Sequence, residues 1–442
     1  MFFMGPTRLS GGRFKKGLPT LPVEVWERIL DWLVVIYTPV RRTSTESTLP
    51  EDLLSCALVC RAWRPRAQTH LFAYPRIKAC NLPTFETAIR KIPVLCSHVQ
   101  EFIFENEPIG TEAKSGVVKT VDTLSHVTRV AHKFPNVHYF LFQDNDLSVE
   151  HPYLSRSIAA CRRIDWLDFF TSVPTRLHHL ARFLAAFRNL TIVSLAVPIL
   201  SEPDITTLSN HCNVLKSSPD TLVVYLEQGS HLLLNWLVKS KTFVKSLQRL
   251  GVIIENRFSS QEITLHAENL QKLLNFCCKH LKVWDFYRCE DIKSMPPGNV
   301  PSISRQRGLY IHLNSAVSLH MQTSLVKAKF KVSISTFQYA LHQLQTVTSK
   351  KMTKIVFLVD SPSRMGRRIR ALWKQLDDTL SAEPYATLTM VQVGYLELDE
   401  DDHPTSTDQF NDAEGFPKLL PTLYSRRILT WNHEPDLDLT FF

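Results

Sequence analysis

The sequence predicts an α/β protein in which a short N-terminal helical unit precedes a long region of repeated strand and helix units. Two observations lead to this fold class. Three helical segments rich in apolar residues lie within 19–75. After residue 80 a short apolar motif recurs, and amphipathic helical stretches separate many of its copies. We therefore expect a flexible basic leader at 1–18, a helical domain at 19–78 and a repeat region at 79–442.

The composition is typical of a folded protein outside the membrane and outside the secretory pathway. The chain has 442 residues, of which 44% are hydrophobic and 21% charged. Its apolar runs are too short for a membrane helix, and its N-terminal residues lack the apolar core of a secretory signal. The nine cysteines form no C-x-x-C pair, which favours reduced thiols. We expect an intracellular protein of the cytoplasm or nucleus, with no membrane partner.

The net charge of +9 is concentrated in residues 1–80. Nucleic-acid binding would require this charge on a stripe with interleaved aromatic residues. Here the charge is divided between the leader, the segment around Arg41 and the segment around Arg64. We interpret it as solvated charge and keep a basic nucleic-acid-associated repeat protein as an alternative function.

The first helical segment is LPVEVWERILDWL at 21–33. Val25, Ile29 and Leu33 recur at helical spacing, and a proline in the first turn loses no backbone hydrogen bond. The pattern predicts a helix of roughly four turns that starts near Leu21. We expect it to stop before a polar loop at 38–48, which contains a proline and clustered serine and threonine.

The second segment, TLPEDLLSCALVCRAW at 48–63, has a capping-box pattern in Thr48 and Glu51. Apolar residues occupy nearly every side of the helix that this segment would form. A third, short helix is predicted at about 66–72. Three helices in so few residues cannot bury all these large apolar side chains among themselves. Part of their surface should therefore contact another protein.

These segments resemble an F-box, whose pattern is LP-x-E-[IV], an Ile-Leu pair, a D-L spacer and V-C-x-x-W. The matching residues are Leu21-Pro22, Glu24, Val25, Ile29-Leu30, Asp52-Leu53-Leu54 and Val59-Cys60-Arg61-x-Trp63. The loop at 38–48 is longer than the usual turn of the family. The resemblance implies a three-helix fold that binds an Skp-type adaptor and, indirectly, the cullin and RING subunits of a ubiquitin ligase. It implies adaptor contacts at Leu21, Pro22, Val25, Ile29, Leu53, Leu54, Val59, Cys60 and Trp63.

Two interpretations remain open for Val59 and Trp63, which either pack inside the helical unit or contact the adaptor. Leu21, Pro22 and Leu53 lie near helix starts and are better candidates for contact. Cys60 is one helical turn from another cysteine, but no further ligand follows at zinc spacing, so we expect no metal there.

The repeat region is defined by a motif of apolar residues at positions one, four and six. Its copies begin at 99, 137, 164, 190, 247, 281, 352 and 388. A weaker unit is expected near 222–228, and 308–322 and 324–332 are expected to be additional strands. Helices are expected at 121–134, 175–187, 231–243, 266–280, 335–347 and 365–380.

Two copies of the motif continue to Asn145 and Cys289, the residue types that a leucine-rich repeat places after its strand. The region resembles the degenerate leucine-rich repeats that follow the F-box in many fungal proteins. This resemblance implies an irregular solenoid with a parallel sheet and helices on its convex side. An irregular α/β layer is the alternative.

A solenoid binds proteins through the residues that lie between the buried positions of its strands. We therefore expect a captured protein to contact Tyr139, Trp166, Asp168 and Asp285. The alternative is that these side chains pack on neighbouring strands.

The sequence contains no motif for a phosphate-binding loop, a nucleophile elbow, a zinc protease or a dinucleotide site. An acidic run at 397–402 is expected to be a solvated loop. We therefore expect no catalytic residue, no cofactor and no metal. The expected function is recruitment of a target protein to a ubiquitin ligase. The alternative is a non-catalytic scaffold whose helical N-terminus binds another partner.

Overall fold

The structure is a computed structural model of the chain. It describes residues 22–43, 49–59, 63–78, 81–105, 130–143, 161–199 except 162, 172 and 173, 217–254 except 228, 260–288, 319, 322, 324–332, 337–359, 367–395 and 418–432. The chain divides into two compact units. The described residues up to Phe72 belong to unit 1, and those from Ala73 belong to unit 2.

Unit 1 consists of three helices, α1 (Val23–Thr43), α2 (Leu49–Val59) and α3 (Arg64–Ala73), whose last residue enters unit 2. Each helix contributes to the core. Leu30 of α1, Leu53 of α2 and Ala67 of α3 are all at most 2% exposed. The rings of Trp26 and Trp63 pack with their centroids 4.5 Å apart.

The expected loop at 38–48 is wrong over 38–43, because α1 continues to Thr43. Pro39 removes one backbone hydrogen bond from the helix but does not end it. The remaining positions, 44–48, lie outside the described residues.

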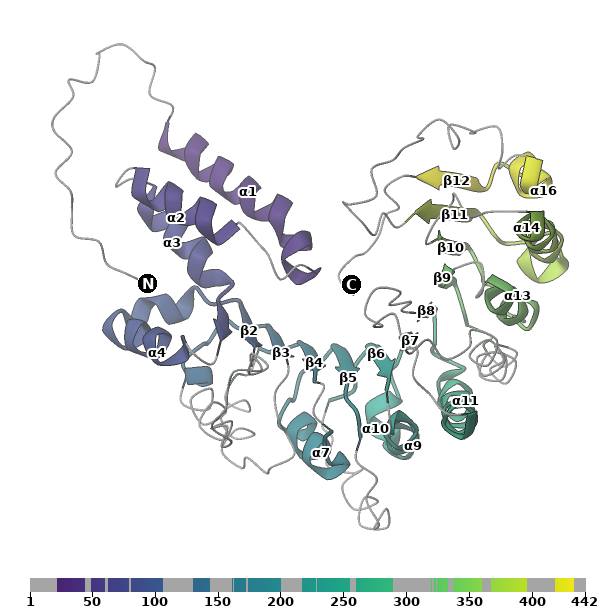
Figure 1. The fold of residues 1–442 in the computed structure, drawn as a ribbon, viewed down its shortest axis with the longest axis horizontal. Helices are drawn as coiled ribbons and strands as arrows, with labels where there is room; N and C mark the ends of the chain where they lie inside the picture. Colours follow the sequence, from purple (N-terminus) through teal and green to yellow (C-terminus); the bar gives the residue numbers. More distant parts are fainter. Residues whose placement is uncertain are drawn as a thin grey trace, which may run out of the picture. The chain divides into compact units, whose positions relative to one another are not determined.

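Unit 2 is built on one sheet of twelve parallel strands, which follow one another in chain order (Figure 1). The strands are β1 (Arg76–Lys78), β2 (Glu101–Glu105), β3 (Tyr139–Gln143), β4 (Trp166–Phe170), β5 (Ile192–Ala196), β6 (Thr221–Leu226), β7 (Arg249–Ile254), β8 (Val283–Arg288), β9 (Lys327–Val332), β10 (Lys354–Val359), β11 (Met390–Tyr395) and β12 (Leu429–Asn432). Because neighbours in sequence are neighbours in the sheet, each unit stacks on the preceding one.

Between the strands lie helices that cover one face of this sheet (Figure 1). They are α4 (Leu82–Lys91), η1 (Pro93–Ser97), α7 (Leu177–Ala185), α9 (Ser230–Lys239), α10 (Lys241–Val244), α11 (Ser260–Cys277), α13 (Phe337–Gln345), α14 (Arg367–Leu380), η4 (Glu383–Tyr385) and α16 (Pro421–Ser425). We call the opposite face the open face because these helices do not cover it, although described side chains on it such as Ile103, Val223 and Val356 are at most 4% exposed.

The core lies between the sheet and these helices and is built from register-matched apolar side chains. Phe142 of β3 pairs with Phe169 of β4, and both rings contact Phe183 of α7 at 5.2 and 5.3 Å between centroids. Farther along, Phe357 of β10 contacts Trp373 of α14 at 6.2 Å. All five rings are at most 2% exposed. The period of two along each strand thus separates a helix-facing row from an open-face row.

Every copy of the apolar motif contains a strand, so the predicted parallel α/β repeat architecture is confirmed. The weak unit at 222–228 is β6, and the extra strand at 324–332 is β9. Arg76–Lys78, which we assigned to the N-terminal domain, is a strand of the repeat sheet. The helix expected at 266–280 begins earlier, at Ser260. Residues 121–129 and most of 308–322 lie outside the described residues, as do Asn145 and Cys289.

Candidate protein-binding surfaces

Helix α1 exposes a stripe of apolar side chains. Pro22, Val25, Ile29 and Trp32 follow one another at helical spacing and share one face of the helix. Val25 and Ile29 are each 38% exposed, and Trp32 is 65% exposed. A large indole ring exposed to water lacks the stabilisation that burial would give it. Such a stripe is therefore typical of a contact surface.

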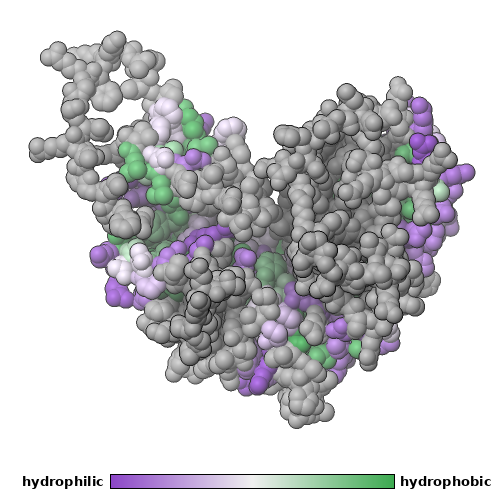
Figure 2. Space-filling view, viewed as in Figure 1, coloured by the Kyte–Doolittle hydropathy of each residue, from purple (hydrophilic) through white to green (hydrophobic). Residues whose placement is uncertain are grey.

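Helix α2 packs against α1 and exposes two leucines of its own. Leu54 is 39% exposed and Leu58, one turn later, is 85% exposed. We call Val25, Ile29, Trp32, Leu54 and Leu58 the helical patch. Figure 2 shows hydrophobic surface on the helices of unit 1.

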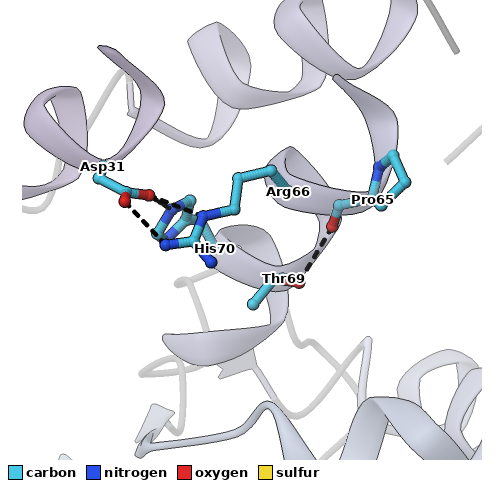
Figure 3. A network of polar contacts seen from close by, with 5 residues as sticks. All are labelled: Asp31, Pro65, Arg66, Thr69 and His70. Carbon is cyan, nitrogen blue, oxygen red and sulfur yellow. Dashed lines mark hydrogen bonds and ion pairs between the residues drawn. The ribbon is translucent and has the colours of Figure 1, made fainter. Parts of the chain in front are cut away.

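A polar cluster fixes the rotation of α1 against α3 (Figure 3). The Asp31 carboxylate accepts hydrogen bonds from Nε and Nη2 of Arg66 at 2.7 and 2.8 Å. Its Oδ1 also lies 2.7 Å from Nε2 of His70. The hydrogen bond from Arg66 is the main reason that the pKa of Asp31 is lowered. Leu30 and Val34, which flank Asp31 on α1, are buried in the core, whereas the stripe of α1 faces outward.

The structure separates the residues for which adaptor contact was predicted. Pro22, Val25, Ile29 and Leu54 are exposed, whereas Leu53 is fully buried. Leu53 is therefore a core residue, although its place near a helix start made it a better candidate for contact.

Trp63 is half-buried against Trp26, which agrees with the interpretation that it packs inside the helical unit. The side chains of Leu21, Val59 and Cys60 lie outside what the structure describes.

Two prominent members of the helical patch were missing from the predicted set. Trp32 lies three residues after Ile29, and Leu58 lies four residues after Leu54, so each is on the same helix face as its predecessor. This helical periodicity would have identified both residues.

On the open face, three of the residues predicted to contact a captured protein form one cluster. The hydroxyl of Tyr139 donates to Oδ2 of Asp168 at 2.7 Å, and Nε1 of Trp166 donates to Oδ1 at 2.9 Å. The two rings meet edge to face with centroids 5.0 Å apart. Tyr139 and Asp168 are buried and Trp166 is half-buried. Trp166 therefore has the most accessible side chain of the three, and the other two pack on neighbouring strands.

The fourth predicted residue, Asp285, is 2% exposed. Its Oδ2 accepts a hydrogen bond from Nε of Arg249 at 2.5 Å. Lys329, which is also 2% exposed, is its register partner on β9. A carboxylate buried in this way requires neighbouring positive charge. Asp285 thus stabilises the arrangement of basic side chains on β7 and β9.

The described residues provide no set of ligands for a metal, since no three or more His, Cys, Asp or Glu side chains come together there. Burial raises the pKa of Cys161 and Cys277 to about 12, so neither thiol is a nucleophile at neutral pH. No helix within the described part of the chain has the length and apolarity needed to cross a membrane.

Comparison with known proteins gives no family for this chain. No protein-family model matches the sequence, and no curated protein matches it. Among solved structures, a protein from Bacteroides fragilis is similar with a TM-score of 0.33 and 11% identity, over 70% of this chain and 68% of that one. The leucine-rich repeat-containing protein LegL7 from Legionella pneumophila has a TM-score of 0.31 and 11% identity, over 67% of this chain and 95% of its own. At these TM-scores the likeness carries no argument about function.

Proposed function

We propose that the chain is a substrate-recruiting F-box subunit of an Skp–cullin–F-box ubiquitin ligase. Unit 1 binds the Skp-type adaptor, which joins the chain indirectly to the cullin and RING subunits. Unit 2 binds a target protein. In this role the chain itself catalyses no reaction. It raises the effective concentration of the target's lysines near the ubiquitin carrier.

One observation carries this proposal. The segments with the F-box-like pattern expose the helical patch, whose five large apolar side chains are of the kind found at contact surfaces. The repeat architecture supports the second half of the proposal, because stacked strand and helix units provide extended surfaces for protein binding.

The test is co-expression with an Skp-type adaptor, followed by affinity capture of a one-to-one complex. Trp32→Asp and Leu58→Asp should each weaken capture by about tenfold or more, because a central apolar contact is replaced by a charge that must be desolvated. Both residues are exposed, so the helical content and the melting temperature should remain near those of the parent chain.

The matched control is Arg64→Asp, which introduces the same side chain at an exposed position in the first turn of α3. It should leave capture unchanged. If the parent chain captures no adaptor at micromolar concentrations, the ubiquitin-ligase role is rejected. A scaffold whose helical patch binds another partner then replaces it.

A further inference from the structure

The edge of the sheet at which the strands begin is rich in lysine between β7 and β10. Because all the strands are parallel, the connections that enter them meet at this one edge. We define the basic edge as Lys245, Lys279, Lys282, Lys327, Lys350, Lys351 and Lys354. The segments 241–254, 278–283, 324–332 and 346–359 contain no aspartate or glutamate. The positive charge is therefore not diluted along these four consecutive units.

Helix dipoles do not account for these lysines. Cations are favoured in the last turn of a helix, yet the last turn of α11 contains no basic residue. Lys279 and Lys282 follow the end of that helix at Cys277, and Lys351 lies well beyond the end of α13 at Gln345. All three side chains are exposed. The helix dipole therefore does not explain their placement, although Nζ of Lys282 also donates a hydrogen bond to Oε1 of Gln248 at 2.8 Å within the fold.

Two of the lysines are held beside each other on the open face. Lys327 and Lys354 are the first residues of β9 and β10 and are register partners. Both are half-buried. Like charges at directly paired positions repel each other, so this part of the edge attracts negative charge.

In the described part of the chain, one carboxylate is paired with a lysine of the basic edge and another with Arg249 of β7. Asp285 is buried against Arg249, and Glu383 lies 3.3 Å from Nζ of Lys350 in an exposed pair, which stabilises the fold little.

The exposed large apolar residues described in unit 2 lie at the same edge of the sheet. Ile92 and Val94 are in the connection that enters β2, Phe276 is in the last turn of α11 and Tyr424 is near the end of α16. Phe276, which is 38% exposed, precedes Lys279 by one turn. An apolar ring beside a row of lysines matches a ligand that is anionic and also carries apolar groups.

We propose that the basic edge and Phe276 bind an acidic segment of a partner protein, with carboxylates on the lysines and an apolar side chain on Phe276. This inference deepens the target-binding half of the proposed function and rests on it. A nucleic acid is the less suitable ligand. Phe276 is the one exposed aromatic side chain described beside these lysines, and stacking of successive bases requires several aromatic side chains interleaved with the cations.

The experiment measures fluorescence anisotropy of a labelled synthetic peptide made of Glu-Asp-Leu triplets, titrated with the full chain at low salt. The double variant Lys279→Glu/Lys282→Glu should raise the dissociation constant by about tenfold or more, because two attractive charges become repulsive. The matched control is Arg370→Glu/Lys374→Glu, which makes the same change at exposed positions within α14. It should change binding less than about twofold, the range of remote exposed charges.

The variant Phe276→Ala distinguishes binding of an acidic peptide with apolar side chains from binding of any polyanion. It should weaken the Glu-Asp-Leu peptide several-fold and leave a peptide of Glu-Asp-Gly triplets unaffected. The proposal is overturned if the control variant loses as much affinity as the test variant. It is also overturned if single-stranded DNA of equal charge binds more tightly than the peptide.

The adaptor test and the peptide test are independent. Lys279→Glu/Lys282→Glu should leave adaptor capture intact, and Trp32→Asp should leave peptide binding intact. Failure of one measurement therefore does not imply failure of the other.

Discussion

A half-buried histidine on α9 and a fully buried histidine on α11 lie side by side. The rings of His231 and His266 have centroids 5.7 Å apart, and His266 is fully buried. Burial lowers the pKa of His231, and burial together with the nearby His231 lowers the pKa of His266 to about 4. Glu262 opposes both shifts. This pair makes the helix layer of unit 2 sensitive to acid.

The free energy of unfolding should fall as the pH is lowered from 7 to 5. In the unfolded chain His266 has an ordinary pKa near 6.5 and takes up a proton in this range, whereas in the folded chain it stays neutral down to about pH 4. Its contribution is present above pH 6.5 and is lost toward pH 4. The expected loss between pH 7 and 5 is about 2 kcal/mol.

The measurement is urea unfolding at both pH values for the parent chain and for His266→Asn. Carboxylates contribute to acid sensitivity in both proteins, so the difference between them isolates the histidine. An equal loss of stability in the two proteins would contradict the assignment.

The helical patch shows that the sequence alone does not predict which single residues of a helix are buried and which are exposed. Leu53 and Leu54 are adjacent, yet one is fully buried and the other is 39% exposed. The second helical segment is apolar almost all round, so its pattern does not specify which side faces α1. That choice depends on the tertiary packing of α2 against α1, where Leu53 and Leu30 are buried.

At the scale of elements, the short helix α16 depends on a side chain from α14. Asp377 is 3% exposed, and its two carboxylate oxygens accept hydrogen bonds from the backbone N–H groups of Thr422 and Leu423 at 3.0 Å. These N–H groups lie in the first turn of α16, where they have no partner within the helix. A distant aspartate therefore caps this helix.

Asp377→Ala should destabilise the last strand and helix of unit 2 by about 1–3 kcal/mol, because it leaves two N–H groups without an acceptor. Hydrogen exchange of α16 and β12 should increase first. The control Asp378→Ala removes the neighbouring carboxylate, which is exposed on the same helix, and should have little effect. Equal exchange in the two variants would show that the cap stabilises nothing.

The strands were predicted more reliably than the other elements. A buried strand of a parallel sheet leaves a local apolar signal, and every copy of the motif carried that signal. Strands β1 and β12 were missed because they are short and lie at the ends of the sheet, where each has one neighbour. The extension of α1 past Pro39 was missed because local propensity favours a loop there. The open-face ion pair of Arg249 and Asp285 depends on strand register, which no local pattern reveals.

At the scale of the molecule, the described strands of unit 2 form a linear stack, because each strand pairs with the strands before and after it in the chain. Stability in such a stack is a sum of local terms and of contacts between neighbouring units. Trp284 of β8 is one such contact. It is fully buried in the helix-facing row, and its Nε1 donates to Oε1 of Gln343 on α13 at 3.1 Å.

Trp284→Ala should therefore damage the stack locally. The cavity and the lost hydrogen bond should lower the free energy of unfolding by about 3–5 kcal/mol. The units around β8 should lose most of this stability. Hydrogen exchange read by mass spectrometry should show lost protection in β7, β8 and β9, with β2 to β4 still protected. Trp284→Phe keeps most of the volume and should show a smaller loss in the same place. A uniform loss along all twelve strands would instead mean that unit 2 folds as one cooperative block, and the additive description of its repeats would be wrong.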